Sequence, residues 1–379
     1  MDIPDYLAEK KHLQTCILDY LDKGKNIIME NSLIKLLNDP KYLADKAELK
    51  AVLYLISRIT NNHHRYTVFY DKIKEIFTHF KDPIAKNLSN REIFDIFRSN
   101  KRILLLLIKE KYLEVDQSIS NSIQRSNFLK ANYISYFLPE IKNFIDEQTR
   151  KEIKKDLLEV SNNNFGLFDD KRNVGENDSD VCNLIRKDSI DEFVKFADKN
   201  YLSFKSTIEE SIFETNPFLI GKKPSLIEYA SFFGSIQIIK FLVSKKVELT
   251  PSLWLYAVHG NNQELLTYLR DNSVQPPDAS FKSCLVESIK CHHNEIADFI
   301  QNNLLSIQSD EKVDDIIFSN ALKYLNYVLI NQDLNDILVF YYLCQNDNLT
   351  LVEKLLNEKD LSSKINTKIV LKFFFCYKV

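Results

Sequence analysis

The residues best suited to chemistry form one local cluster of thiols and imidazoles, Cys284, Cys291, His292 and His293. Thiolate sulfur and imidazole nitrogen are the ligands that structural zinc prefers. Cys284 and Cys291 are seven residues apart, so on a helix they share a face but are separated by about 10 Å. That distance is too long for one tetrahedral ion. The spacing therefore predicts a packed cysteine pair followed by a polar turn, and no metal site.

A second histidine pair, His63 and His64, follows Asn61 and Asn62 where a helix is expected to end. Histidine suits this position because it can bond the exposed carbonyl groups of the last turn. A catalytic histidine would need a positioned nucleophile or carboxylate, and the sequence places none beside this pair. We predict no catalytic residue, no metal ligand and no cofactor.

The six glycines exclude several common active-site loops. The two closest, Gly166 and Gly175, are nine positions apart, so GxGxxG, Walker-type and GxSxG motifs are absent from the sequence. We therefore expect a protein that is not an enzyme and has no small-molecule substrate. The alternative, an all-helical enzyme, would require a cleft with a buried cluster of His, Asp or Glu whose pKa values are shifted.

Charge, cysteine use and hydropathy limit the class of partner and the compartment. The chain has 50 basic and 53 acidic residues in mixed order, which gives no basic patch for a nucleic acid. The six cysteines are scattered and no apolar leader precedes them, so we expect reduced thiols and an intracellular, cytoplasmic protein. The apolar runs are far shorter than the roughly 20 residues of a membrane span, and none is predicted.

Apolar residues that recur at steps of three and four predict an all-α chain. Residues 1–160 are expected to form a helical N-terminal domain, either a bundle or irregular helical repeats. Ser89 and Asn90 are the candidates to cap one of its helices, and Pro40, Pro83 and Pro139 suit first turns. The Asn-, Asp- and Gly-rich segment 161–178 is expected to be a linker loop.

A two-helix unit repeats after the linker. Ser225–Ala230 returns as Ser252–Ala257 after 27 residues, and each copy is followed by a glycine and a second apolar helix. Weaker copies are expected around 181–196, 284–300 and 339–356. Because one helix pair cannot cover its apolar face, we predict an alpha-solenoid of stacked helical hairpins over residues 179–357, followed by an atypical tail at 358–379.

The stretch Ala230–Val243 resembles the core of an ankyrin repeat, with a small residue, a turn glycine and an Ile-Ile-Lys-Phe-Leu second helix. Through Ser225–Asn261 the whole chain resembles a large trichomonad-type family of ankyrin-repeat proteins with an uncharacterised helical N-terminal domain. The resemblance implies a protein–protein interaction scaffold. Regular repeats usually follow this region in that family, so the array is expected to be truncated, and a non-functional fragment is an alternative.

Aromatic residues at variable repeat positions are the predicted partner-binding set. We expect that side chains exposed along a concave surface bind a protein whose identity the sequence does not give. The alternative is that the same side chains fill the space between stacked units. The set comprises Phe232, Phe233, Trp254, Tyr256 and His259.

Overall fold

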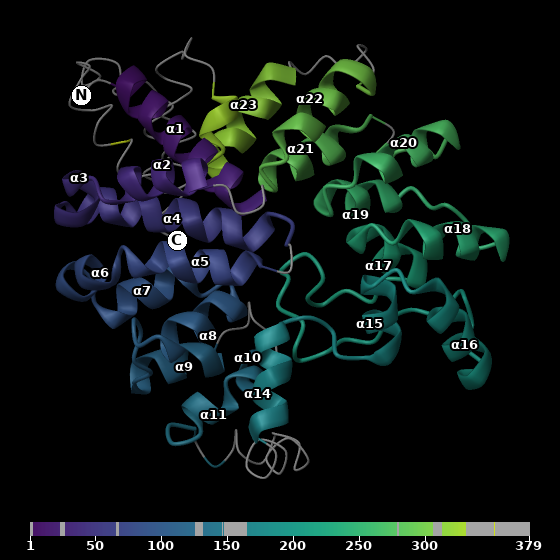
Figure 1. Cartoon of the computed structure of the whole chain (residues 1–379), viewed down its shortest axis with the longest axis horizontal. Coiled ribbons are helices and arrows are strands. Elements are labelled where there is room, and N and C mark those ends of the chain that lie inside the picture. The colour runs from purple at the N-terminus through teal and green to yellow at the C-terminus, as the bar shows by residue number, and fades with distance from the viewer. Residues whose placement is uncertain are drawn as a thin grey trace, which may run out of the picture. The chain divides into compact units, whose positions relative to one another are not determined.

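The computed structural model describes residues 3–22, 27–65, 68–125, 132–145, 165–278, 280–305 and 313–330, together with positions 147 and 352. In these ranges the regular secondary structure is helical, and an isolated antiparallel bridge joins Thr207 to Ser225 (Figure 1). The all-α prediction is confirmed. None of the helices in the described residues is long and apolar enough to span a bilayer.

The chain divides into two compact units, Met1–Leu55 with Ile307–Val379, and Ile56–Ser306. This division differs from the predicted segments 1–160, 161–178, 179–357 and 358–379. The described part of the first unit contains α1 (Ile3–Asp22), α2 (Ile27–Leu37), α3 (Pro40–Ala44), the start of α4 (Lys46–Asn62), α23 (Val313–Tyr324) and the 3-10 helix η1 (Tyr327–Leu329). Helix α1 packs on α2 and η1, and Gln14 donates a hydrogen bond to Asn326 over 3.0 Å.

The second unit begins with short helices joined by brief turns. As predicted, Ser89 caps α7: it accepts from the Glu92 amide, while the Glu92 carboxylate accepts from the Ser89 amide. Asn100 caps α8 by accepting from the Ile103 amide. The helices are α5 (Phe69–Thr78), α6 (Lys81–Asn87), α7 (Asn90–Phe97), α8 (Lys101–Lys109), α9 (Gln117–Arg125), α10 (Asn132–Tyr136) and α11 (Leu138–Ile141).

The predicted linker loop is wrong for residues 165–174, which form helix α14 (Phe165–Val174). Tertiary packing outweighs the turn-forming composition here. Phe168 is buried, and so is the guanidinium of Arg172, which hydrogen-bonds Glu140, Asp169 and the carbonyl of Tyr136. Residues 161–164 lie outside the described ranges.

Four helical hairpins follow, and the repeat prediction is confirmed for them. They are α15 (Asp180–Arg186) with α16 (Ile190–Asn200), α17 (Leu226–Phe233) with α18 (Ile236–Ser244), α19 (Leu253–His259) with α20 (Gln263–Asp271), and α21 (Lys282–Lys290) with α22 (Asn294–Asn303). The first helices pack in the order α15, α17, α19, α21, as Figure 1 shows. The expected copy at 339–356 and the tail at 358–379 fall outside the described residues, apart from position 352.

Turn residues and caps hold successive hairpins together. Gly234 ends α17 in the left-handed conformation, with φ of 69°, which a glycine adopts without strain. Beside it, the Ser235 hydroxyl donates to the carbonyl of Ile185 in the preceding hairpin over 2.6 Å. The Asp188 carboxylate accepts from the amides of Gln237 and Ile238. The start of α18 is thus bonded to the end of α15.

Candidate functional site

The structure buries most of the predicted partner-binding set. Phe232, Trp254, Tyr256 and His259 are buried, and Phe233 is half-buried. The prediction that these side chains are exposed along a groove is therefore wrong for the four buried ones. The alternative, that they fill the stack, describes their positions.

For Phe232, Tyr256 and His259 the reason is a long connection between α16 and α17 that repeat spacing does not reveal. Phe218, from this connection, packs against Phe232, Tyr256 and His259 with ring centroids 5.7, 5.0 and 4.4 Å away. Trp254 donates from its indole nitrogen to the carbonyl of Val274 over 3.0 Å. These aromatic side chains therefore hold the loops against the first helices.

His259, Glu287 and Cys291 form a buried polar cluster between α19 and α21. Nδ1 of His259 lies 2.7 Å from Glu287 Oε1 and 3.2 Å from Cys291 Sγ. Burial alone would raise the pKa of Glu287, but the hydrogen bond from His259 and the charge of Lys290 lower it to about 2. Burial raises the pKa of the Cys291 thiol well above its usual value, and the Glu287 charge adds to this effect.

This arrangement does not form a nucleophile–base pair. The Glu287 carboxylate accepts a hydrogen bond, so His259 Nδ1 carries the proton and its lone pair lies on Nε2. Nε2 has no hydrogen-bond partner, and the imidazole packs against the rings of both Phe218 and Phe232. A base for Cys291 would have to present its lone pair to the thiol. The His259 nitrogen that lies 3.2 Å from the thiol, Nδ1, instead carries a proton that it donates to Glu287.

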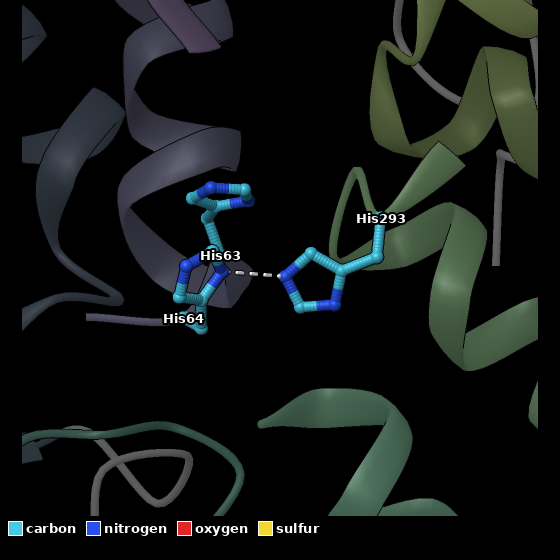
Figure 2. Close-up of side chains that lie close together, drawn as sticks. All are labelled: His63, His64 and His293. Carbon is cyan, nitrogen blue, oxygen red and sulfur yellow. Dashed lines mark hydrogen bonds between the residues drawn. The ribbon is translucent and has the colours of Figure 1, made fainter. Parts of the chain in front are cut away.

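A second cluster brings together the pair His63 and His64 with one histidine of the other pair, His293. His63 and His64 follow the end of α4, and His293 precedes α22. Figure 2 shows the rings of His64 and His293 facing each other, with His64 Nδ1 2.9 Å from His293 Nε2. The three side chains are 1%, 7% and 4% exposed. One ring nitrogen from each lies within 4.8 Å of those of the other two, which is a set that can hold a metal ion.

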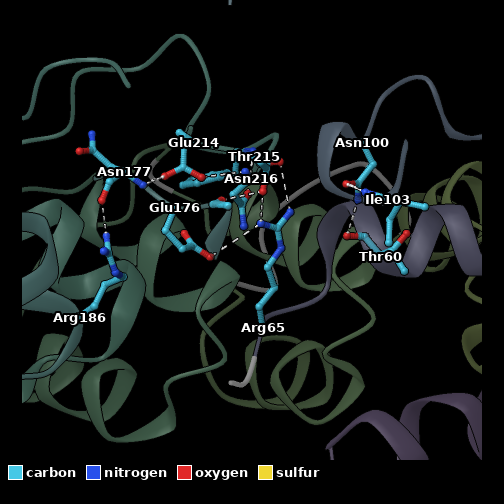
Figure 3. Close-up of polar contacts among 12 residues, drawn as sticks. Thr60, Arg65, Asn100, Ile103, Glu176, Asn177, Arg186, Glu214, Thr215 and Asn216 are labelled. Carbon is cyan, nitrogen blue, oxygen red and sulfur yellow. Dashed lines mark hydrogen bonds and ion pairs between the residues drawn. The ribbon is translucent and has the colours of Figure 1, made fainter. Parts of the chain in front are cut away.

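A buried network of charged residues joins the turn after α14 to the connection at residues 214–216 (Figure 3). Arg65 donates to the hydroxyl and carbonyl oxygens of Thr215 over 2.9 and 3.2 Å and lies 3.8 Å from Glu176. Glu214 accepts from the amides of Asn177 and Asn216. Burial and the proximity of the two carboxylates raise the pKa of Glu176, and burial raises the pKa of Glu214.

This network does not form a hydrolytic site. Glu214 lines a small pocket with Ser211 and Tyr229, but both of its carboxylate oxygens accept backbone amides. Ser211, the hydroxyl in the pocket wall, donates to the Asp178 carboxylate over 2.7 Å. Burial would raise the pKa of Asp178, but its hydrogen bonds from Lys171 and Ser211 lower it, so this carboxylate is a weak base. The buried carboxylates therefore fix the loops in place.

A row of aromatic side chains on the second helices is the feature that our sequence analysis missed. When the four hairpins are aligned, one position of the second helix is aromatic in every copy. The residue just before it is polar in every copy: Lys195, Lys240, Thr267 and Asp298. The aromatic side chains are only partly buried, whereas the four polar side chains that precede them are exposed. The four aromatic residues are Phe196, Phe241, Tyr268 and Phe299. Aligning the repeats in the sequence would have revealed this row.

Comparison with known proteins adds no relative: no protein-family model, no curated protein and no solved structure matches this chain.

Proposed function

We propose that this chain is a non-enzymatic helical-repeat scaffold that binds a protein partner through the second helices of its hairpins. The observation that carries the proposal is the aromatic row Phe196, Phe241, Tyr268 and Phe299, one side chain at the same position of α16, α18, α20 and α22. Partly exposed aromatic side chains are frequent anchors of protein interfaces. Their repetition along a stack provides several anchors in a regular series.

The polar row beside the aromatic residues has a charge gradient. Lys195 and Lys240 are exposed on α16 and α18, Thr267 is exposed on α20, and Asp298 is exposed on α22. Complementary charge directs the orientation of a partner and its rate of association more than it adds affinity. We therefore place the acidic part of the partner over α16 and α18.

The buried clusters support a role without catalysis. His259 Nδ1 donates its proton to Glu287 and offers no lone pair to Cys291, and the Glu214 carboxylate is held by backbone amides. An ankyrin-type scaffold, as the resemblance of Ala230–Val243 implies, would use such side chains to hold its loops. If these buried side chains only hold loops, substituting them lowers the stability of the fold and alters partner binding only indirectly.

The test uses the exposed lysines, because their substitution leaves the core intact. The double variant Lys195→Glu, Lys240→Glu is compared with Lys11→Glu, Lys35→Glu, which makes the same charge change on exposed positions of α1 and α2. Each full-length protein is coupled to a matrix and used to capture partners from the cell that produces it. We expect wild type and the α1/α2 variant to retain the same protein and the α16/α18 variant to retain at least 10-fold less.

Binding of the captured protein is then measured with purified components at two salt concentrations. The affinity should fall with salt for wild type and depend less on salt for the α16/α18 variant. If all three proteins retain the partner equally, the partner does not bind the second-helix surface. Failure of wild type to retain any protein above the bare matrix would contradict the scaffold itself.

A further inference from the structure

His63, His64 and His293 are brought together from positions 229 residues apart in the sequence. His63 and His64 leave the C-terminal end of α4, and His293 is the N-cap residue of α22. All three belong to the unit Ile56–Ser306. The cluster therefore joins the first helix of this unit to its last hairpin.

His293 stands at the repeat position that Ser235 occupies two hairpins earlier. Each precedes a second helix, and each donates to a carbonyl near the end of a first helix in the preceding hairpin, Ile185 for Ser235 and Val258 for His293. A serine satisfies that carbonyl with its single hydroxyl. An imidazole satisfies it with Nδ1–H and places a second nitrogen beyond the stack, facing His64.

Backbone carbonyls set the tautomers of two of the three rings. Nδ1 of His63 lies 2.8 Å from the carbonyl of Cys291, and Nδ1 of His293 lies 2.9 Å from the carbonyl of Val258. A carbonyl only accepts, so both Nδ1 atoms carry protons and both lone pairs lie on Nε2. Metal-binding histidines are usually oriented by this kind of bond from the other ring nitrogen to a carbonyl.

We propose that His63, His64 and His293 bind one divalent transition-metal ion, with zinc as the best match, through Nε2 of His63, Nε2 of His293 and one ring nitrogen of His64. Three imidazoles in a buried site suit zinc, copper or nickel better than calcium or magnesium, which prefer oxygen. Zinc accepts the tetrahedral geometry that three ring nitrogens and one further ligand provide. Water is the ligand that we assign to the fourth position.

The ion would replace the hydrogen bond between His64 and His293. Nitrogens bound to tetrahedral zinc at about 2.0–2.1 Å lie about 3.3 Å apart. The present separation of 2.9 Å between His64 Nδ1 and His293 Nε2 therefore has to widen by only a few tenths of an ångström. The ring of His64 either moves its proton from Nδ1 to Nε2 or turns to present Nε2.

The neighbouring cluster of His259, Glu287 and Cys291 is the competing site. It also has three metal-ligand groups within 4.8 Å of one another. Its three groups are already bonded to one another, because His259 Nδ1 and the Cys291 thiol both donate to Glu287, over 2.7 and 3.6 Å. Zinc there would displace both of these interactions and a thiol proton, whereas no thiol proton has to be lost from the three imidazoles of His63, His64 and His293.

The experiment titrates the full-length protein, purified and stripped with a chelator, with Zn²⁺ against a chromophoric competitor. The variants are His64→Gln, which removes a proposed ligand, Cys291→Ser, which removes a ligand of the neighbouring cluster, and His12→Gln. His12 is exposed on α1 near Cys16, so it controls for metal held by surface groups. Circular dichroism confirms that each variant is folded, and thermal unfolding is followed with and without Zn²⁺.

We expect one Zn²⁺ per chain, a higher unfolding midpoint with Zn²⁺, and affinity at least 10-fold lower in His64→Gln. The affinities of His12→Gln and Cys291→Ser should stay within about twofold of wild type. No binding to wild type at micromolar Zn²⁺ would overturn the proposal, as would unchanged affinity in His64→Gln. Loss of binding in His12→Gln or in Cys291→Ser would assign the metal elsewhere.

A spectroscopic measurement on the wild type keeps the assignment testable if His64→Gln does not fold. Co²⁺ in a three-histidine site gives the visible absorption of a tetrahedral ion without sulfur-to-cobalt charge transfer in the near ultraviolet. Charge-transfer absorption would show a thiolate ligand and overturn the proposal. These readouts are independent of partner binding, so failure of the scaffold proposal leaves the metal site untouched, and the reverse also holds.

Discussion

The backbone carbonyl of Phe232 occupies the space in which Gly260 would place a side chain. A Cβ atom added to Gly260 would lie 2.2 Å from Phe232 O, and this contact joins the ends of α17 and α19. The backbone of Gly260 has a φ of −76°, so the requirement for glycine comes from this close approach and not from the turn conformation. The tight stacking of two first helices thus depends on the absence of one methyl group.

Replacing Gly260 with alanine should weaken the hairpin stack. Because the obstacle is backbone, α17 and α19 must separate, and we expect the free energy of unfolding to fall by about 3 kcal/mol. Gly166→Ala is the matched control, because a Cβ there meets nothing within 4 Å and the residue is in α14. That variant should be unchanged or about 0.5–1 kcal/mol more stable. Urea denaturation measures both, and similar losses would contradict the close contact.

Arg172 should be essential to the packing of α14. Its side chain is 0% exposed, and it donates to both carboxylate oxygens of Glu140 over 2.9 and 2.7 Å and to Asp169 over 2.8 Å. Arg172→Met removes every one of these bonds from a buried site, and we expect a loss of about 3 kcal/mol in unfolding free energy. The exposed pair Arg270–Asp271 provides the control, since Arg270→Met should change stability by less than about 0.5 kcal/mol. Equal effects in guanidinium denaturation would refute the prediction.

Lys101 should make stability depend on pH. Burial lowers the pKa of this lysine to about 7, with Glu214 opposing the effect and Arg65 adding to it, while Nζ donates to the carbonyl of Ile212. Between pH 7 and the ordinary lysine value of 10.5, the unfolded chain binds a proton that the folded chain lacks. The Lys101 contribution to unfolding free energy therefore rises with pH in this window, by at most about 1.4 kcal/mol per unit.

The measurement compares wild type with Lys101→Met in urea at pH 7.5 and pH 9.5. We expect the stability of the variant relative to wild type to fall by about 2 kcal/mol between the two pH values. Lys199→Met, an exposed position on α16, controls for the general effect of removing a positive charge. A difference between wild type and Lys101→Met that does not change with pH would contradict a buried, proton-losing lysine.

Cys291 should resist alkylation in the folded protein. Its thiol is buried, burial raises its pKa well above the usual value, and the His259 nitrogen beside it, Nδ1, carries a proton that it donates to Glu287 and so cannot act as a base. Cys16 is only partly buried and should be labelled first, although burial also raises its pKa. Peptide mapping by mass spectrometry after timed labelling at pH 7.5 gives the rate at each cysteine. Faster labelling at Cys291 than at Cys16 would restore the enzyme alternative.

The helical periodicity carried most of the fold prediction. The cap at Ser89 and the copies beginning at Ser225 and Ser252 lie where the sequence placed them, because caps and apolar spacing are local properties. The linker prediction failed at 165–174 because the burial of Phe168 and Arg172 depends on residues far away in the chain. Composition alone contains no information about those partners.

The candidate sites were much less predictable. Sequence analysis placed His63–His64 after a helix and His292–His293 in an inter-helix turn, and both placements agree with the structure. Their meeting depends on how the last hairpin packs against the end of α4, which no local pattern encodes. The packing of His259 depends likewise on Phe218 in the 201–225 connection, and that of Trp254 depends on Val274 and Phe281 after α20. The paths of these connections cannot be inferred from the repeat pattern.

The pairing of Gln14 with Asn326 has a consequence for how the chain is made. Gln14 bonds Asn326 and the amide of Val328, so part of the first helix has its partner more than 300 residues later. A ribosome adding about 5–20 residues per second delivers that partner roughly 15–60 s after the helix. Residues 56–306 emerge in between and can fold first. Helix α1, which is made before residues 56–306, therefore gains these contacts only after that segment has emerged, and during this interval the surface around Gln14 is one that a chaperone would need to cover.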